Sequence, residues 1–381
     1  MPTYLPWLDL LRFVACVLVI LSHLNPFPQN PEANHFGHNG VGLFFSISGY
    51  LIGSVLMNGR ERPEWVTRFY ANRLLRIYPA LLAALVLYGA LLLTGQGKPG
   101  LWGMWPEFRD NLPYYLTFTY HLSPNKGVPY AIVWTLCVEE YFYLVLPLLF
   151  WTFGPRGTAA VLVGVIIVTL EPRLDHIPGT PEGTWFLLPV NLLSGAVLAT
   201  FRPQPRDGRP WVGVLGLGCV LLNGVVGWFH PFGPVMGLVT TLTVWSFAVT
   251  RTPVPGPLNW MVLFGKWSYG IYLVHLPFCS GGLRAAQWLG LEGAPGVVYF
   301  GVATLIATAG STAVAGALYY AVERPVLDRR PSVTTRRWAR RLAAAIQVSL
   351  VPAGVFYWLT VGGWTKVQDW WRSLRWVWDG S

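Results

Sequence analysis

The apolar segment LDLLRFVACVLVILSH, residues 8 to 23, decides what kind of protein this sequence can form. As a helix it is nearly long enough to cross the ~30 Å hydrocarbon core of a bilayer. It carries Asp9 and Arg12 near its start and His23 at its end, and no basic residue precedes it. Such a segment is a poor match to a cleaved signal peptide, so we predict a first membrane helix at residues 7–24.

The composition of the whole chain points to the same class of protein. Of the 381 residues, 53% are hydrophobic and only 12% are charged, which leaves too little polar surface to cover a soluble globule. The net charge of +10 lies in short basic clusters between apolar runs and not on one continuous face, so we expect no nucleic-acid partner. The sequence therefore predicts an all-α, polytopic transmembrane helix bundle embedded in the lipid bilayer.

Apolar runs of about spanning length recur along nearly the whole chain. The ten predicted core spans are residues 7–24, 41–58, 78–95, 132–152, 157–170, 184–201, 210–228, 234–250, 258–280 and 294–321. We predict an eleventh helix at residues 344–362, followed by a Trp-rich tail suited to the headgroup layer. The chain is accordingly divided into a membrane-embedded domain at residues 1–325 and a C-terminal segment at residues 326–381 that holds a basic stretch, the extra helix and the tail.

The distribution of arginine sets the predicted orientation. The connections at residues 59–77, 202–210 and 322–343 are rich in arginine, whereas the loops on the opposite side hold few basic residues. Because basic connections stay on the cytoplasmic side, we predict a cytoplasmic N-terminus.

Charged groups inside the first predicted span are candidate functional residues, because each costs about 2.5–3.5 kcal/mol in the hydrocarbon core. Arg12 and His23 would share one face of a helix, about 16 Å apart along its axis. His23 can accept a hydroxyl proton near neutral pH and is our first candidate for a general base. The alternatives are that His23 is a helix-end histidine bonded to a carbonyl, and that Arg12 is paired with Asp9 one turn away.

Two later spans carry candidate groups at the same predicted depth. Glu139 and Glu140, in WTLCVEEYFYLVLP, point roughly 100° apart on a helix, so at most one shares a face with the apolar bundle contacts. One of them could orient a histidine, or both could reach interfacial water. His275, in GKWSYGIYLVHLP, is a second candidate base, and the alternative is a histidine of the helical core.

A pair of arginines precedes the third predicted span. In FYANRLLRIYP, Arg73 and Arg76 are three residues apart and can bind phosphate together, or they can serve as ordinary cytoplasmic anchors. The four cysteines form no CxxC pair and lie within or beside apolar runs, so we expect neither a disulfide nor a metal site.

Six segments together resemble the acyltransferase-3 family of bacterial integral membrane O-acyltransferases. They are LDLLRFVACVLVILSH (8–23), GVGLFFSISGYLIG (40–53), RFYANRLLRIYP (68–79), WTLCVEEYFYLVLP (134–147), WSYGIYLVHLP (267–277) and VERP (322–325). The resemblance implies that His23 is catalytic, that Glu139 and His275 occupy motif positions of the site, and that Arg73 and Arg76 bind an acyl-coenzyme A donor. It implies a structural role for Glu323. The sequence departs from the common pattern at Gly42, where many members carry aspartate.

The function implied is transfer of an acyl group, with acetyl as first choice, from cytoplasmic acyl-CoA to a hydroxyl of a carbohydrate or glycosylated acceptor. Arg73, Arg76 and Arg12 would bind the donor phosphates, while His23 would deprotonate the acceptor or accept the acyl group transiently. The implied location is the bacterial cytoplasmic membrane. The rival interpretations are a transporter or flippase for a glycan or lipid intermediate, which would use the same charges as a polar path, and a membrane scaffold.

Overall fold

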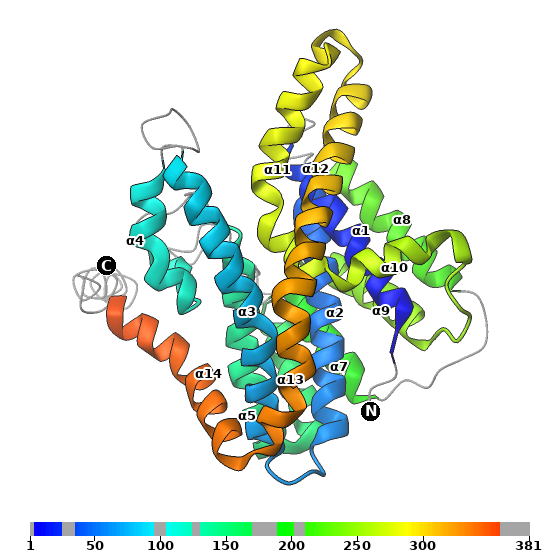
Figure 1. Ribbon diagram of the computed structural model, residues 1–381. Coiled ribbons are helices and arrows are strands. Elements are labelled where there is room, and N and C mark those ends of the chain that lie inside the picture. Colours follow the sequence, from blue (N-terminus) through cyan, green and yellow to red (C-terminus); the bar gives the residue numbers. More distant parts are fainter. Residues whose placement is uncertain are drawn as a thin grey trace, which may run out of the picture. The chain divides into compact units, whose positions relative to one another are not determined.

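The computed structural model describes residues 4–24, 35–94, 104–123, 130–169, 189–201 and 210–358. In chain order the helices are α1 (Pro6–His23), α2 (Phe36–Gly59), α3 (Trp65–Thr94), α4 (Trp105–Leu116), α5 (Val133–Val168), α7 (Val190–Thr200), α8 (Trp211–Val226), α9 (Pro234–Val249), α10 (Asn259–Lys266), α11 (Ser268–Trp288), α12 (Gly296–Leu318), α13 (Arg324–Thr335) and α14 (Arg337–Trp358) (Figure 1). Short 3₁₀ turns lie at Tyr120–Leu122, Gly256–Leu258 and Leu291–Gly293, and a π-helical turn, Tyr319–Glu323, joins α12 to α13. The Trp-rich tail lies outside the described residues.

Length and hydropathy identify the membrane helices. Within the described part of the chain, five helical segments are long and apolar enough to cross a bilayer: α1, α2, α3, α5 and the continuous stretch Gly296–Arg330. The helices α7, α8 and α9 are apolar but shorter. The chain is therefore a multi-pass membrane protein built as a helix bundle, as the sequence predicts.

Two predicted boundaries differ because a helix is longer or more continuous than its apolar run. Helix α3 begins at Trp65, well before the predicted span at residues 78–95, so Arg73 and Arg76 lie inside the helix. The predicted spans at 132–152 and 157–170 form one helical run, α5, bent at Gly154 with φ 64° and ψ −178°. That φ is one that glycine adopts at little steric cost, and Pro155 is suited to restart a helix directly after it.

Two further differences arise from packing and from amphipathic character. The predicted span at residues 258–280 is two helices, α10 and α11, separated at Trp267. A Cβ atom at Gly265 would overlap the carbonyl oxygen of Asp9, so α10 lies directly against the backbone of α1 just before the break. Helix α4 lies in a stretch that hydropathy alone assigns to a loop, because charged and amide side chains are interspersed among its apolar residues, although one side of the helix is buried.

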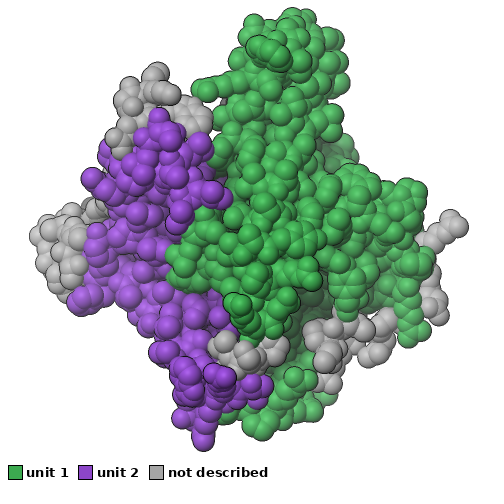
Figure 2. Space-filling view, in the orientation of Figure 1, with its two compact units in different colours: residues 1–66, 76–84, 145–331 green, residues 67–75, 85–144, 332–381 purple. Residues whose placement is uncertain are grey.

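The chain divides into two compact units, which Figure 2 shows in separate colours. Unit 1 comprises residues 1–66, 76–84 and 145–331, and unit 2 comprises residues 67–75, 85–144 and 332–381. Each unit draws on segments distant in sequence, and α3 and α5 contribute to both. The two units are described separately below.

Small residues allow the helices of unit 1 to approach closely. A Cβ atom at Gly49 of α2 would overlap the carbonyl oxygen of Leu192 in α7, and Gly195 of α7 lies equally close to the backbone of Ser46. Such contacts are typical of helices that associate in a membrane, where close packing replaces the hydrophobic effect. Helices α11 and α12 lie side by side as an antiparallel hairpin (Figure 1), and Gly282 packs against the backbone of Ala303.

A buried cluster joins α1 to α11 and so positions the ends of both helices. Phe13, Cys16 and Ile20 of α1 pack with Ile271 and Cys279 of α11. The Cys16 thiol donates to the carbonyl oxygen of Ser268 at 3.5 Å, and the Cys279 thiol donates to that of Ile20 at 3.8 Å. These contacts fix how the C-terminal end of α1 faces the first turns of α11.

Unit 2 has an aromatic core. The ring of Tyr88 lies 4.9 Å from that of Tyr130 in a T-shaped arrangement, and Phe108 lies 5.7 Å from Tyr115. Such pairs stabilise by geometry as well as by buried area. Helix α14 packs against α4 in the same unit, where the rings of Tyr114 and Tyr357 lie 5.5 Å apart.

Candidate functional site

Two of the predicted histidines meet in unit 1. His23 is the last residue of α1 and is exposed, whereas His275 lies in the second turn of α11 and is fully buried. Their ring centroids are 5.0 Å apart, with the ring planes inclined by 45°. Two residues separated by more than 250 positions in sequence therefore form one candidate acid–base centre, in which one ring is accessible and the other is held by protein.

A backbone contact determines the tautomer of His275. Its Nδ1 lies 2.7 Å from the carbonyl oxygen of Tyr272. A carbonyl oxygen only accepts, so Nδ1 carries the hydrogen, and in the neutral ring Nε2 carries the lone pair. That Nε2 is buried and has no hydrogen-bond partner among the described residues. The carbonyl-bonded arrangement that the sequence left open for His23 is thus the one that His275 adopts.

Arg12 is held on the same helix as His23. Its Nη1 lies 2.6 Å from Oδ1 of Asp9, with exposed side-chain fractions of 29% for Arg12 and 9% for Asp9. The ion pair predicted from the three-residue spacing is confirmed. Helix α1 is continuous from Pro6 to His23, so Arg12 and His23 keep the separation of about 16 Å along the axis.

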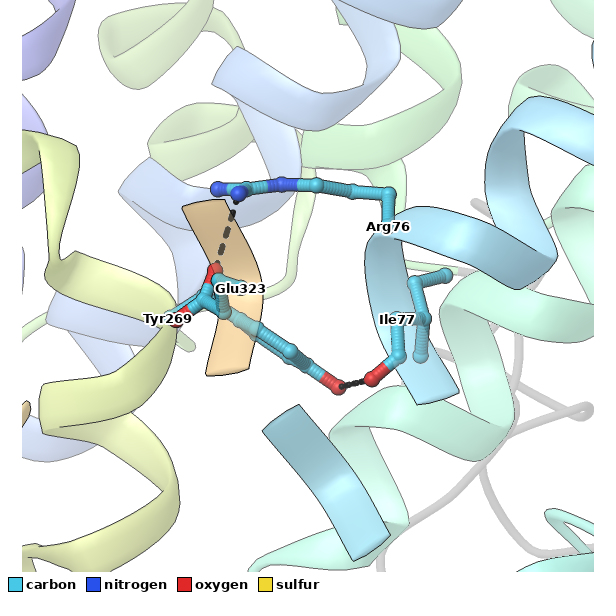
Figure 3. A network of polar contacts seen from close by, with 4 residues as sticks. All are labelled: Arg76, Ile77, Tyr269 and Glu323. Atoms are coloured by element: carbon cyan, nitrogen blue, oxygen red, sulfur yellow. Dashed lines mark hydrogen bonds and ion pairs between the residues drawn. The ribbon is translucent and has the colours of Figure 1, made fainter. Parts of the chain in front are cut away.

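Arg76 is paired with a buried carboxylate in unit 1. Its Nη1 lies 2.9 Å from Oε2 of Glu323, whose side chain is only 2% exposed (Figure 3). Beside this pair, the hydroxyl of Tyr269 donates to the carbonyl oxygen of Ile77 at 3.0 Å, which ties α11 to α3 (Figure 3). Glu323 lies in the π-helical turn, a form that is rare and often found at functional sites.

Arg73 belongs to unit 2 and has aromatic surroundings. Its guanidinium carbon lies 5.6 Å from the ring centroid of Phe69 and 5.7 Å from that of Tyr143. Attraction to the negative faces of two rings helps to hold the cation in place. The hydroxyl of Tyr143 donates to Oε2 of Glu139 at 3.1 Å, so the predicted acidic residue lies in the same group of side chains.

The two adjacent glutamates have different surroundings. Glu139 is half-buried and accepts from Tyr143, whereas Glu140 is 2% exposed and accepts from the side-chain amide of Gln347 in α14. The prediction that at most one of them faces the apolar contacts agrees with this arrangement, and the buried one is Glu140. Sequence reasoning missed Gln347, whose only sequence signal is a polar residue within an apolar helix.

The predicted site residues therefore fall into two groups. Unit 1 holds Arg12, His23, Arg76 and His275, and unit 2 holds Arg73 and Glu139. Their catalytic and donor-binding roles remain predictions. Among the described residues, no three His, Cys, Asp or Glu side chains are arranged to hold a metal ion.

The departure at Gly42 has a local structural explanation. A Cβ atom there would lie 2.8 Å from the side-chain nitrogen of Asn191, which is itself fully buried. That nitrogen donates to Thr240 at 3.0 Å and to the carbonyl oxygen of Pro231 at 3.2 Å. A larger residue at position 42 would displace this amide. The glycine therefore leaves the room that the side chain of Asn191 occupies.

Comparison with known proteins gives a match along most of the chain. A family model described as "Acyltransferase domain" (Acyl_transf_3) matches residues 5–320. A peptidoglycan O-acetyltransferase, OatA, of Listeria monocytogenes is 28% identical over 322 residues, which is 73% of this chain and 50% of the relative. The O-acetyltransferase OatA of Staphylococcus aureus is 28% identical over 312 residues, which is 72% of this chain and 51% of the relative. The chain thus spans about half the length of these relatives, and no solved structure matches it significantly.

Proposed function

Since this chain belongs to the acyltransferase-3 family, we propose that it transfers an acyl group, in the first instance acetyl, from acyl-CoA to a hydroxyl of a carbohydrate or glycosylated acceptor. The proposal takes the donor to be cytoplasmic coenzyme A thioester and the acceptor to belong to the cell envelope. The relative of Listeria monocytogenes is named for peptidoglycan, so peptidoglycan is the first acceptor to test.

The observation that carries the proposal is the pairing of His23 with His275 in unit 1. An exposed imidazole can reach a hydroxyl, and the neighbouring imidazole is buried with its tautomer fixed and its Nε2 unpartnered among the described residues. A positive charge that forms on His23 during proton transfer is stabilised by the dipole of the helix that ends at His23. A purely structural role would not require this arrangement.

In the proposed reaction, His23 accepts the proton of the acceptor hydroxyl while its oxygen attacks the thioester carbonyl carbon. The new carbon–oxygen bond forms, the carbon–sulfur bond breaks, and the departing thiolate takes the proton from His23. The alternative is a two-step route in which a nitrogen of His23 first accepts the acyl group and the hydroxyl then displaces it. A covalent acyl adduct on the protein, trapped without acceptor, distinguishes the second route from the first.

We propose a role in binding donor phosphate for Arg12 and Arg76 of unit 1 and, taken by itself, for Arg73 of unit 2. The guanidinium of Arg73 lies close to two aromatic rings, and that of Arg76 is positioned by its ion pair with Glu323. Fixed guanidinium groups suit phosphate because they present several donors in a rigid plane. Glu139 is proposed as an acidic residue of the reaction, as its motif position implies, and its carboxylate accepts a hydrogen bond from Tyr143.

The proposed topology has ten core spans, an eleventh helix at α14 and a cytoplasmic N-terminus in the bacterial cytoplasmic membrane. Two observations support it: arginine is concentrated in the stretches 59–77, 202–210 and 322–343, and the relatives are bacterial. The proposed domain division at residue 325 follows the C-terminal limit of the resemblance, and the family match ends nearby at residue 320.

The test compares a deletion strain complemented with wild-type protein or with His23→Ala. Mass spectrometry of peptidoglycan and of other envelope glycans should show an acyl mass increment that only the wild type restores. An increment restored equally by both proteins would remove His23 from the mechanism. Glycans that change location without any mass increment would favour the transporter interpretation.

A further inference from the structure

We propose that His38 and His230 form a subsite that binds hydroxyl groups of the acceptor beside His23. The inference rests on the proposed function, because it takes the acceptor to be a carbohydrate or a glycosylated molecule. All three histidines belong to unit 1. The proton transfer described above uses neither His38 nor His230, so both are available for binding the acceptor.

The two histidines pack against one buried aromatic ring. The ring centroid of His38, in the first turn of α2, lies 5.6 Å from that of Phe232, and the ring planes are inclined by 75°. The ring centroid of His230 lies 5.9 Å from that of Phe232, with an inclination of 66°. Phe232 is 1% exposed, whereas both histidines are only half-buried. One buried ring therefore supports two imidazoles that still reach the surface.

A pair of buried asparagines fixes the chain next to each histidine. Asn39 follows His38 in α2, and its side-chain oxygen accepts from the amide of Asn223 in α8 at 3.2 Å. The same amide donates to the carbonyl oxygen of Phe229 at 3.0 Å, and the N–H of Phe229 donates to the side-chain oxygen of Asn223 at 3.0 Å. His38 and His230 are thus each adjacent in sequence to a residue of this network, and buried hydrogen bonds set their relative positions.

Further contacts hold the segment that carries His230 and determine its tautomer. The carbonyl oxygen of Pro231 accepts from the side-chain amide of Asn191 at 3.2 Å. That of Phe232 accepts from the N–H of Val190 at 3.2 Å. The N–H of Phe232 donates to Nδ1 of His230 at 3.3 Å, so in the neutral ring Nε2 carries the hydrogen. A segment with little freedom to move therefore presents His230 as a hydrogen-bond donor.

The contact between α1 and α2 brings this subsite to the end of α1 that carries His23. A Cβ atom at Gly37 would overlap the side chain of Ser22. Gly37 directly precedes His38, and Ser22 directly precedes His23. The proposed topology also puts the end of α1 and the segment of His230 on the outer side of the membrane, where an acceptor of the cell envelope would arrive.

A carbohydrate acceptor can use such a subsite because it carries several hydroxyl groups close together. His23 takes the proton of one hydroxyl, and the neighbouring hydroxyls remain for His38 and His230 to bind. A hydroxyl oxygen can accept the hydrogen from Nε2 of His230. Because both imidazoles are held in place before the acceptor arrives, they orient it at a small cost in entropy. The subsite therefore favours acceptors that carry further hydroxyls beside the reacting one.

Substitutions that keep the packing but remove the hydrogen-bonding nitrogens test this role. His38→Phe keeps a ring against Phe232. His230→Asn keeps an oxygen near the position of Nδ1, which can accept from the N–H of Phe232, but it lacks the donor at Nε2. Each variant should raise the KM for the acceptor about fivefold, the loss of one hydrogen bond, with kcat unchanged. His230→Gln, whose amide lies nearer the position of Nε2, should recover part of this loss.

The assay measures transfer of radiolabelled acetyl from acetyl-CoA to soluble envelope glycans, peptidoglycan fragments first, by the full chain in detergent. The Kd for coenzyme A and the midpoint of thermal unfolding are measured alongside and should not change. His121→Phe replaces an exposed histidine of unit 2 and is the control, with an unchanged KM expected.

An unchanged acceptor KM in either His38→Phe or His230→Asn would overturn the inference. A loss of activity that follows a lower unfolding midpoint would also overturn it, because the histidines would then serve the fold and not the acceptor. So would a fall in kcat at constant KM. A wild-type protein that transfers acetyl to none of the glycans would instead overturn the proposed function, and the inference with it.

Discussion

The ion pair between Arg76 and Glu323 should respond very differently to the loss of each partner. The side chain of Glu323 is 2% exposed, whereas that of Arg76 is 31% exposed, although the two atoms are only 2.9 Å apart. Arg76→Ala leaves a buried carboxylate without its counter-ion. Glu323→Gln leaves a guanidinium that still reaches solvent and an amide oxygen that still accepts its hydrogen bond.

The exposures set the expected magnitudes. Removing one partner from a buried ion pair lowers the free energy of unfolding by about 3–5 kcal/mol. Because Arg76 is partly exposed, the loss for Arg76→Ala should be smaller, about 2–3 kcal/mol. Glu323→Gln should lower the free energy of unfolding by about 1 kcal/mol. This is the typical net contribution of one hydrogen bond, and the substitution weakens that bond by removing the charge of its acceptor. The double variant should be more stable than Arg76→Ala alone, because it no longer holds an uncompensated buried charge.

The assay is the midpoint of thermal unfolding in detergent, measured for both single variants, the double variant and a control. Arg109→Ala is a suitable control, because Arg109 pairs with Asp110 on the surface with side-chain exposures of 60% and 52%. Its effect should be close to zero. The reasoning is refuted if Glu323→Gln destabilises as much as Arg76→Ala, or if the two effects simply add in the double variant.

Three shorter predictions concern unit 1. His275→Asn retains a donor for the carbonyl of Tyr272 but lacks Nε2. The variant should therefore keep the midpoint of thermal unfolding, while the rate of acyl transfer falls roughly 10²-fold, the lower end of the range for loss of an acid–base group. An unchanged rate would remove His275 from the mechanism. Gly265→Ala should lower the unfolding midpoint and the yield of folded protein, because its Cβ atom meets the backbone of Asp9; Gly59→Ala, in open space, is the control. His23→Ala should bind coenzyme A with wild-type affinity but transfer no acyl group in a radiolabel assay, and lost binding would show that His23 holds the donor instead.

Hydropathy predicted the helices best where a single apolar run matches a single helix. The predicted spans 7–24, 210–228 and 234–250 correspond to α1, α8 and α9 with boundaries shifted by a residue or two. Apolar character within one window is all that such helices require. The break at Trp267 could not be predicted in this way, because the close approach of α10 to the backbone of Asp9 involves residues far apart in sequence.

The same distinction between local and distant contacts applies to the candidate site. The Asp9–Arg12 pair was predictable, because a three-residue spacing on one helix brings the two side chains together. The spacing of Glu139 and Glu140 predicted that at most one of them shares a face with the apolar bundle contacts, but it could not select Glu140, whose partner Gln347 lies far away in sequence in α14.

An ionisable or amide side chain inside an apolar helix can be read from sequence as a group that needs a partner, whereas the identity of the partner depends on packing. Glu323 illustrates the consequence. The family resemblance assigned it only a structural role, yet it fixes the guanidinium of Arg76, 247 positions away, at a place proposed to bind the donor. Fixing a cation on one side leaves its remaining hydrogen-bond donors directed to whatever anion approaches from the other side. Under the proposed function, a residue that is structural in this sense also sets where the donor binds, and exchanging it should change donor affinity as well as stability.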